Sequence, residues 1–110
     1  MIRCTLRLVV SAAHRRQVVA SLTPLIGSTR VEPGCRACAL LTEIEEPKAI
    51  VLTEEWDAQD DLDRHLRSAE YRRVLAAIEL SQEAPQIHFD TVVSRAGIEV
   101  VEAARTPRTR

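Results

Sequence analysis

The run VEPGCRACALLTEIEEPKAIVLTEEW, residues 31–56, contains two turn patterns and two strand patterns. In Glu32-Pro33-Gly34, proline presets φ and glycine supplies a positive φ, which predicts a turn. Residues 35–42 then predict a strand, residues 45–48 a second turn, and residues 49–56 another strand. The rest of the chain is arranged around these two consecutive strands.

The strand predicted over residues 49–56 has two different faces, because successive side chains of a strand point to opposite sides. One face carries Ile50, Leu52, Glu54 and Trp56, and the other carries Val51, Thr53 and Glu55. If helices cover the Trp56 face, Glu54 lies between the sheet and the helices. We expect Glu55 to form an ion pair on the opposite face, since a buried carboxylate needs a partner. Its candidate partners are Arg3, Arg7 and His88.

Upstream of this stretch, residues 2–10 alternate between apolar and polar and predict a strand with one apolar face. Ser11 is a residue type favoured at a helix N-cap. Apolar residues then recur at helical spacing, which predicts a helix over residues 12–26. Pro24 is expected to kink this helix or end it early.

Downstream of Trp56, two helical patterns follow one another. Asp57 with Asp60 resembles a capping box and predicts a helix that continues through His65 and Leu66. The apolar phase then changes, and a second stripe at helical spacing follows. Its members are Tyr71, Val74, Leu75 and Ile78.

Beyond Pro85, residues 86–94 predict a fourth strand, and residues 98–101 predict a short additional strand. The main elements therefore follow the order β-α-β-β-α-β, which predicts an α+β, ferredoxin-like fold with a four-stranded antiparallel sheet and helices on one face. We assign residues 1–102 to this domain and residues 103–110 to a flexible basic tail.

The uncovered face of this sheet is expected to carry apolar or neutral groups such as Val51, Thr53 and Val92. A partner usually covers an exposed apolar face of this size. We therefore expect a homodimer that forms through the open sheet face. A small apolar or aromatic molecule is the other expected partner.

The charge balance argues against several classes of protein. The chain has 110 residues, with 15 Lys and Arg, 16 Asp and Glu, and a formal net charge of −1, and it lacks the clustered basic face typical of nucleic-acid binding. No apolar run approaches the length of a membrane span, and the N-terminal residues resemble no signal segment. Three cysteines, an odd number, suit a reducing compartment. We expect a cytoplasmic protein that binds neither nucleic acid nor membrane.

Cys35 and Cys38 form a Cys-x-x-Cys pair, but no second cysteine pair completes a zinc site. Residues three apart in a strand point to opposite faces, so we expect the two sulfurs to diverge and to serve only in packing. The glycines, Gly27, Gly34 and Gly97, form no phosphate-binding loop. We therefore expect neither a metal nor a cofactor.

Three pieces of the sequence together resemble the antibiotic-biosynthesis monooxygenase (ABM) family. They are the turn over residues 30–35, the strand end Glu54-Glu55-Trp56, and the segment from Leu62 through His65 and Ser68 to Tyr71. The resemblance covers nearly the whole chain and implies a dimeric α/β barrel, in which two ferredoxin-like sheets pack face to face. It also implies a pocket between each sheet and its own helices. Some members oxidise quinols or polycyclic aromatic intermediates with molecular oxygen and without a cofactor.

The leading hypothesis is therefore a cofactor-independent monooxygenase that acts on a quinol or a polycyclic phenol. His65 is the candidate base or hydrogen-bond partner, because the pKa of an imidazole lies near working pH. The candidate substrate-binding residues are Trp56, Tyr71, Phe89 and Glu54. The alternative for His65 is a half-buried side chain bonded to a strand carbonyl, and for Trp56 it is a core residue.

Other members of the family suggest other functions. The haem-degrading members depend on an asparagine in the first strand, and this chain contains no asparagine, so haem oxygenation is not expected. A non-catalytic dimeric module that binds a small ligand or serves in assembly is the second hypothesis. The third is an isomerase-like enzyme for a small metabolite, for which Arg3 and Arg7 would have to line the pocket.

Overall fold

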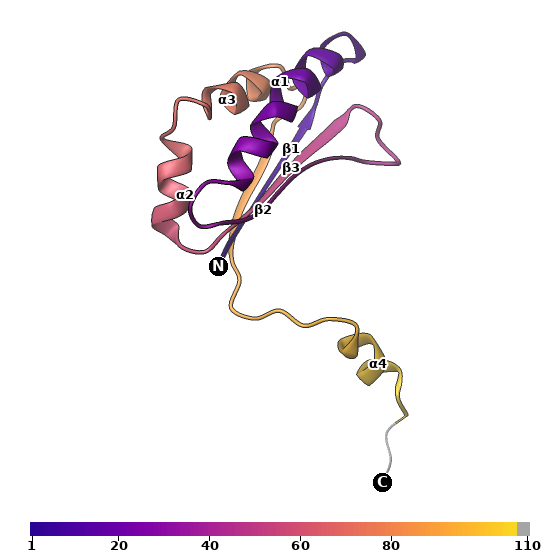
Figure 1. Ribbon diagram of the computed structural model, residues 1–110. Coiled ribbons are helices and arrows are strands. Elements are labelled where there is room, and N and C mark those ends of the chain that lie inside the picture. Colours follow the sequence, from indigo (N-terminus) through magenta and orange to yellow (C-terminus); the bar gives the residue numbers. More distant parts are fainter. Residues whose placement is uncertain (108–110) are drawn as a thin grey trace.

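The computed structural model describes residues 1–107, and the elements up to residue 91 follow the predicted order (Figure 1). They are β1 (Ile2–Val9), α1 (Ala12–Arg30), β2 (Cys35–Thr42), β3 (Ala49–Trp56), α2 (Gln59–Leu66), α3 (Arg72–Glu79), β4 (Gln86–Thr91) and α4 (Glu99–Arg105). The change of apolar phase predicted after Leu66 is the gap between α2 and α3. The prediction of an α+β, ferredoxin-like fold is confirmed.

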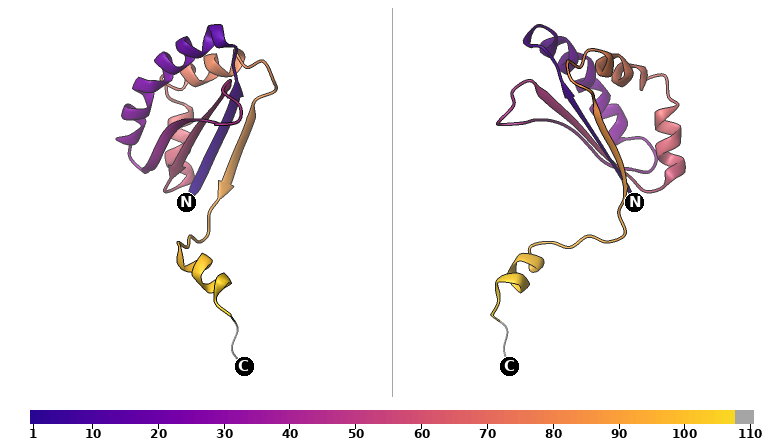
Figure 2. Two further views of the ribbon diagram at one scale, coloured as in Figure 1. Left: turned by 90° about the vertical axis from the view of Figure 1, so that its right-hand side faces the viewer. Right: turned by 180° about the vertical axis from the view of Figure 1, so that it is seen from behind.

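The four strands form one antiparallel sheet in the order β2-β3-β1-β4. Helices α1, α2 and α3 all lie on one face, and the other face is uncovered (Figures 1 and 2). The register places Leu6 of β1 between Leu52 of β3 and Ile87 of β4. Alternation along the strands therefore sends one apolar row toward the helices, as the sequence predicts.

This helix-covered face carries the core. The larger cluster includes Leu6, Leu8, Val10, Val18, Leu22, Leu25, Ile50, Leu52 and Val74, and a smaller cluster contains Cys4, Trp56 and Leu62. Full burial of an aliphatic side chain of this kind contributes about 1.5–3 kcal/mol. With so few aromatic residues, aliphatic packing supplies most of the stability.

Helix α1 is longer than predicted, because it passes through Pro24 and ends at Arg30 rather than near residue 26. An interior proline removes one backbone hydrogen bond and costs about 3 kcal/mol. Leu25, Ile26 and Thr29 are buried beyond the proline, and their packing offsets that cost. The N-cap prediction is confirmed, since the Ser11 hydroxyl accepts the backbone N–H of His14. Neither α1 nor any other helix within residues 1–107 combines the length and apolar character needed to cross a membrane.

Two local predictions are wrong at the ends of helices and strands. The N-cap residue of α2 is Ala58 rather than Asp57, and it makes no side-chain cap. Asp57 instead forms an ion pair with Arg36 across the strand ends. Strand β4 ends at Thr91 rather than at residue 94.

The additional strand predicted over residues 98–101 is wrong, because this region belongs to helix α4. Glu99 and Glu102 lie in its first turn and Arg105 in its last turn, an arrangement that complements the helix dipole. The Glu99 carboxylate also accepts the backbone N–H of Gly97 at 2.7 Å. These local interactions outweigh the strand preference of the β-branched residues.

The chain leaves the domain after Val92, whose backbone N–H still donates to the carbonyl of Met1 at 2.8 Å, and α4 stands apart from the sheet (Figures 1 and 2). Helix α4 has no buried residue, and the side chain of Val93 is 92 % exposed. Arg95 fastens the start of this segment to the sheet, since its Nη2 lies 2.7 Å from Oε1 of Glu55. The predicted domain boundary at residue 102 falls inside α4, and residues 108–110 of the predicted basic tail lie outside the described residues.

A β-bulge in β2 corrects the prediction for the two cysteines. The register shifts between Cys35 and Ala37, so that Cys35 lies opposite Trp56 and Cys38 lies opposite Glu54. Since Glu54 and Trp56 are two residues apart on one face, both cysteines face the helices, and the prediction that their sulfurs diverge is wrong. One extra residue in a strand has this effect because side chains alternate with a period of two. Both cysteines are free thiols.

Candidate functional site

Glu54 is a carboxylate buried among the apolar residues of the helix-covered face, with only 5 % of its surface exposed. A buried carboxylate requires hydrogen-bond donors, and two are present. Nε1 of Trp56, on the same face of β3, donates to Oε1 of Glu54 at 3.1 Å. Nε2 of His65, on α2, lies 3.1 Å from Oε2. Each oxygen of the Glu54 carboxylate therefore has one donor, which comes from β3 for Oε1 and from α2 for Oε2.

His65 is the centre of this arrangement and is fully buried. While its Nε2 faces Glu54, its Nδ1 lies 2.8 Å from Oε2 of Glu32. Carboxylates only accept hydrogen bonds, so the doubly protonated imidazolium satisfies both contacts. Burial lowers the pKa of His65, but the hydrogen bonds and charges of Glu54 and then Glu32 outweigh this effect and raise the pKa above its ordinary value.

Glu32 reaches His65 from the turn that follows α1. Gly34 of this turn has φ of 82°, a left-handed conformation that favours glycine. Its carbonyl accepts the backbone N–H of Asp57 at 2.8 Å, and the carbonyl of Pro33 accepts the guanidinium of Arg64. The turn is thus fastened to the β3–α2 connection at Asp57 and to the last turn of α2 at Arg64. The Glu32 side chain is 27 % exposed, so the hydrogen-bonded chain runs from the interior to solvent.

Two aromatic rings enclose the imidazole. The centroid of Trp56 lies 4.7 Å from that of His65, with the rings tilted by 34°. Tyr71, at the start of α3, approaches at 5.4 Å with its ring nearly perpendicular. A cation within about 6 Å of an aromatic centroid is attracted by the ring. We refer to Glu32, Glu54, Trp56, His65 and Tyr71 as the His65 cluster.

A small crevice opens beside this cluster, toward β4. It is lined by Cys4, Leu6, Leu52, Glu54, Leu66, Tyr71, Ile87 and Phe89, and its volume is about 10 Å³, enough for about one water molecule. Of the predicted site residues, Glu54, Tyr71 and Phe89 line this crevice. Trp56 and His65 lie behind Glu54 instead. Phe89 is about half exposed and forms the outer edge.

The crevice presents a carboxylate acceptor and a phenol donor. Burial, then the charge of Glu54, raises the pKa of Tyr71 to about 12, so the phenol remains neutral at physiological pH. Its hydroxyl makes no hydrogen bond with any other group of residues 1–107, and is therefore available to a molecule in the crevice. Burial also raises the pKa of Cys4 to about 12, with Glu54 adding to the effect, so this thiol contributes an apolar wall rather than a thiolate.

The His65 cluster lies apart from a much larger cavity. This cavity lies between α1 and the edge of the sheet and is lined by none of the cluster residues. Buried, mutually paired ionisable groups are a better indicator of chemistry than volume alone. We therefore place the candidate active site at the His65 cluster and its crevice.

The family model for antibiotic biosynthesis monooxygenase matches residues 1–77, which include every residue of this cluster. The chain belongs to this family. A comparison with curated proteins finds no match.

Solved structures of ABM proteins and their neighbours share the fold. A crystal structure of an antibiotic biosynthesis monooxygenase superposes with a TM-score of 0.76 at 22 % identity, covering 86 % of this chain and 100 % of that chain. A proposed monooxygenase of the same kind from Deinococcus radiodurans gives 0.80 at 21 % identity, with 89 % and 98 % covered. The protein Rv0793 from Mycobacterium tuberculosis gives 0.78 at 24 % identity, with 87 % and 98 % covered.

Sequence reasoning missed Glu32 as a member of the cluster. Glu32-Pro33-Gly34 is predicted as a turn, and a turn has no periodicity from which the direction of a side chain can be derived. It also left open which glutamate faces the helices. The structure assigns Glu54 to the helix-covered face and Glu55 to the opposite face, where Glu55 binds Arg3 at 3.3 Å as predicted. Among residues 1–107, no three His, Cys, Asp or Glu side chains converge as metal ligands do.

Proposed function

We propose that this ABM-family protein is a cofactor-independent monooxygenase that acts on a quinol or a polycyclic phenol. The observation that supports it is the hydrogen-bonded chain Glu54–His65–Glu32, which connects an apolar crevice to solvent. A phenolic substrate whose hydroxyl bonds to Glu54 could lose its proton along this chain. The resulting anion is electron-rich and can itself reduce molecular oxygen, so the reaction needs no separate electron donor.

Within this proposal, the residues have different roles. Glu54 accepts the substrate proton, because it is the ionisable member of the chain that lines the crevice. His65 is a positioning residue that holds Glu54 and passes the proton to Glu32. Tyr71 donates its free hydroxyl to the substrate oxyanion. Phe89, with the aliphatic walls, contacts the ring system and excludes water.

Oxygen uptake with a panel of naphthohydroquinones and anthrones tests the proposal, with the rate of autoxidation in buffer subtracted. Glu54→Gln keeps the shape of the side chain but removes the base, and we expect kcat to fall by about 10²–10⁴-fold. Glu55→Gln is the matched control, because Glu55 is the next residue on the opposite face. Absence of uptake above the buffer rate, or equal rates for the two variants, would rule out the assigned role of Glu54.

A non-catalytic module that binds a small ligand is the second candidate, favoured by the small volume of the crevice. The contact between the Trp56 and His65 rings fills the space where a pocket between sheet and helix could have been. A quinone that binds the wild type without any oxygen uptake by the corresponding quinol would favour this candidate. The isomerase-like alternative loses its expected arginines, since Arg3 and Arg7 lie on the uncovered face with Glu55 and Glu43.

We also propose a homodimer that forms through the uncovered sheet face. Leu41 and Val51 supply apolar surface there, while the ion pairs of Arg3 and Arg7 make the face more polar than the sequence suggests. Sedimentation velocity of the wild type and of Thr53→Arg, which places a charge at the middle of this face, tests the proposal. A wild type that sediments as a monomer at all concentrations would contradict it.

A further inference from the structure

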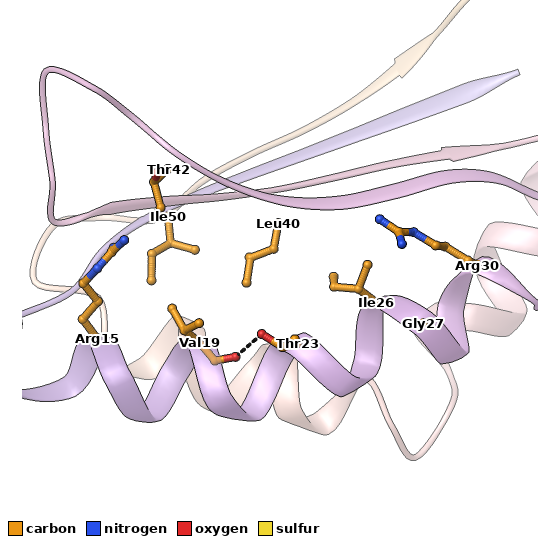
Figure 3. A pocket seen from close by; sticks show the side chains of 9 residues that line it. All are labelled: Arg15, Val19, Thr23, Ile26, Gly27, Arg30, Leu40, Thr42 and Ile50. Carbon is orange, nitrogen blue, oxygen red and sulfur yellow. Dashed lines mark hydrogen bonds between the residues drawn. The ribbon is translucent and has the colours of Figure 1, made fainter.

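A second cavity, much larger than the crevice beside Glu54, lies between α1 and the β2 edge of the sheet and shares no lining residue with the His65 cluster (Figure 3). Its volume is about 530 Å³, within the range of pockets that bind small organic molecules. The centre is apolar: Val19 and Ile26 of α1 face Leu40 and Ile50 of the sheet. We refer to this cavity as the arginine groove, because an arginine stands at each end.

Arg15 and Arg30 extend toward each other from the two ends of the groove (Figure 3). The Cα atoms of the two residues are about 22 Å apart along the axis of α1, because an α-helix rises 1.5 Å per residue. The apolar side chains occupy the space between them. The groove is therefore elongated, with an aliphatic middle and cationic ends.

The positive charge of the groove is not compensated by the protein. Nη1 of Arg15 is buried and has no hydrogen-bond partner, the one such side-chain atom among residues 1–107. Arg30 uses its Nε to bind the carbonyl of Cys38 at 2.9 Å. No acidic side chain lines the groove, and neither arginine takes part in an ion pair within the described residues. A buried guanidinium nitrogen without a partner is unfavourable, so an anion beside it would be stabilised.

We propose that the arginine groove binds a medium-chain aliphatic carboxylate. The carboxylate group pairs with the Arg15 guanidinium, whose planar donors match carboxylate geometry. The hydrocarbon chain lies along Val19, Ile26 and Leu40 and covers apolar surface that is otherwise open to water. This ligand site is separate from the crevice beside Glu54 and does not depend on the monooxygenase proposal.

Proton–nitrogen correlation NMR of the full chain, titrated with sodium decanoate, tests the proposal, with decan-1-ol as the uncharged control. We expect decanoate to shift the amide resonances of Val19, Gly27 and Leu40. Arg15→Gln should weaken decanoate binding about tenfold, which corresponds to about 1.4 kcal/mol, and leave decanol binding unchanged. Arg16→Gln is the matched control, because Arg16 is the exposed neighbour on α1 and does not line the groove.

A second variant keeps the test decisive if Arg15→Gln folds poorly. Thr42→Glu leaves Arg15 in place and adds a carboxylate at the exposed mouth of the groove, where it should repel decanoate. The proposal is overturned if decanoate shifts no groove resonance, or if Arg15→Gln and Arg16→Gln bind it equally. It is also overturned if Arg15→Gln converts a dimer into a monomer in sedimentation, since the groove would then be a contact between two copies.

Discussion

The two halves of the helix-covered face differ in whether their charged groups are paired within the protein. Under α2 and α3, the imidazolium of His65 is paired with two carboxylates and enclosed by two rings, and the adjoining crevice has a volume of about 10 Å³. Under α1, two arginines face an apolar groove of about 530 Å³ without any carboxylate. In the first half, the buried charges pair with one another. In the second half, the arginine charges are unpaired among the described residues, and the proposed ligand would neutralise one of them.

This difference shows that the volume of a cavity and the presence of paired buried charges vary independently on one face of the sheet. A closed, fully paired cluster can still move protons, whereas an open groove with an unpaired cation is suited to binding. Three predictions test how far the stability of the His65 cluster depends on its ion pairs, and how far the cluster differs from the arginine groove.

The largest effect is expected from Glu54→Ala. This substitution leaves the Nε2–H of the buried His65 ring and the Trp56 N–H without their acceptor, and removal of one partner from a buried ion pair costs about 3–5 kcal/mol. Urea denaturation followed by circular dichroism measures the loss. The control is Glu55→Ala, whose partners Arg3 and Arg95 have side chains that are 42 % and 56 % exposed and for which we expect a loss of less than about 1 kcal/mol. Equal losses would mean that burial does not distinguish the two glutamates.

A smaller effect is expected from pH. The folded-state pKa of His65 is raised above the ordinary value of 6.5, so the charged ring stabilises the fold fully below pH 6.5. This contribution is lost as the pH rises through the folded-state pKa. NMR titration of the His65 ring should give a midpoint above 6.5, and Glu32→Gln, which removes one carboxylate charge, should lower it. A midpoint below 6.5 in the wild type would show that burial outweighs the two carboxylates.

The smallest effects are expected when one glycine in each half is replaced by alanine. Gly34→Ala forces an alanine into a left-handed conformation, at about 1–2 kcal/mol, and its Cβ would lie 2.2 Å from the Asp61 side chain. Gly27→Ala, in α1 at the groove, meets no atom within 4 Å and should stabilise the helix by about 0.5–1 kcal/mol. Thermal unfolding of both variants should therefore shift in opposite directions. A shift in the same direction would contradict the assigned role of the Gly34 turn.

Much of the fold could be predicted because local signals agree with packing. The bounds of β2 and β3 follow from the turns at Pro33-Gly34 and Pro47, and the period of two assigns Glu54 and Trp56 to one face. The family resemblance depends on the same residues. The sequence therefore places His65 and Tyr71 on the helices that follow Trp56, whereas the place of Glu54 depends on which face of the sheet the helices cover.

The remainder depends on long-range or non-periodic structure. The length of α1 depends on the burial of Thr29, which lies beyond a proline that locally predicts a helix end. The bulge between Cys35 and Ala37 changes the phase of β2 although no glycine or proline lies within the strand. Glu32 and His65 are 33 residues apart in sequence. They meet only because the turn that carries Glu32 is fastened to the β3–α2 connection. Burial of these groups is a property of the assembled fold.

The small volume of the crevice beside Tyr71 has a kinetic consequence. A molecule larger than water can contact Glu54 only after side chains that line the crevice have moved apart. Binding that requires such a change is slower than the usual association rates of about 10⁵–10⁷ M⁻¹s⁻¹. Association at this site should therefore follow the frequency with which the crevice opens, and should vary little with the diffusion coefficient of the incoming molecule.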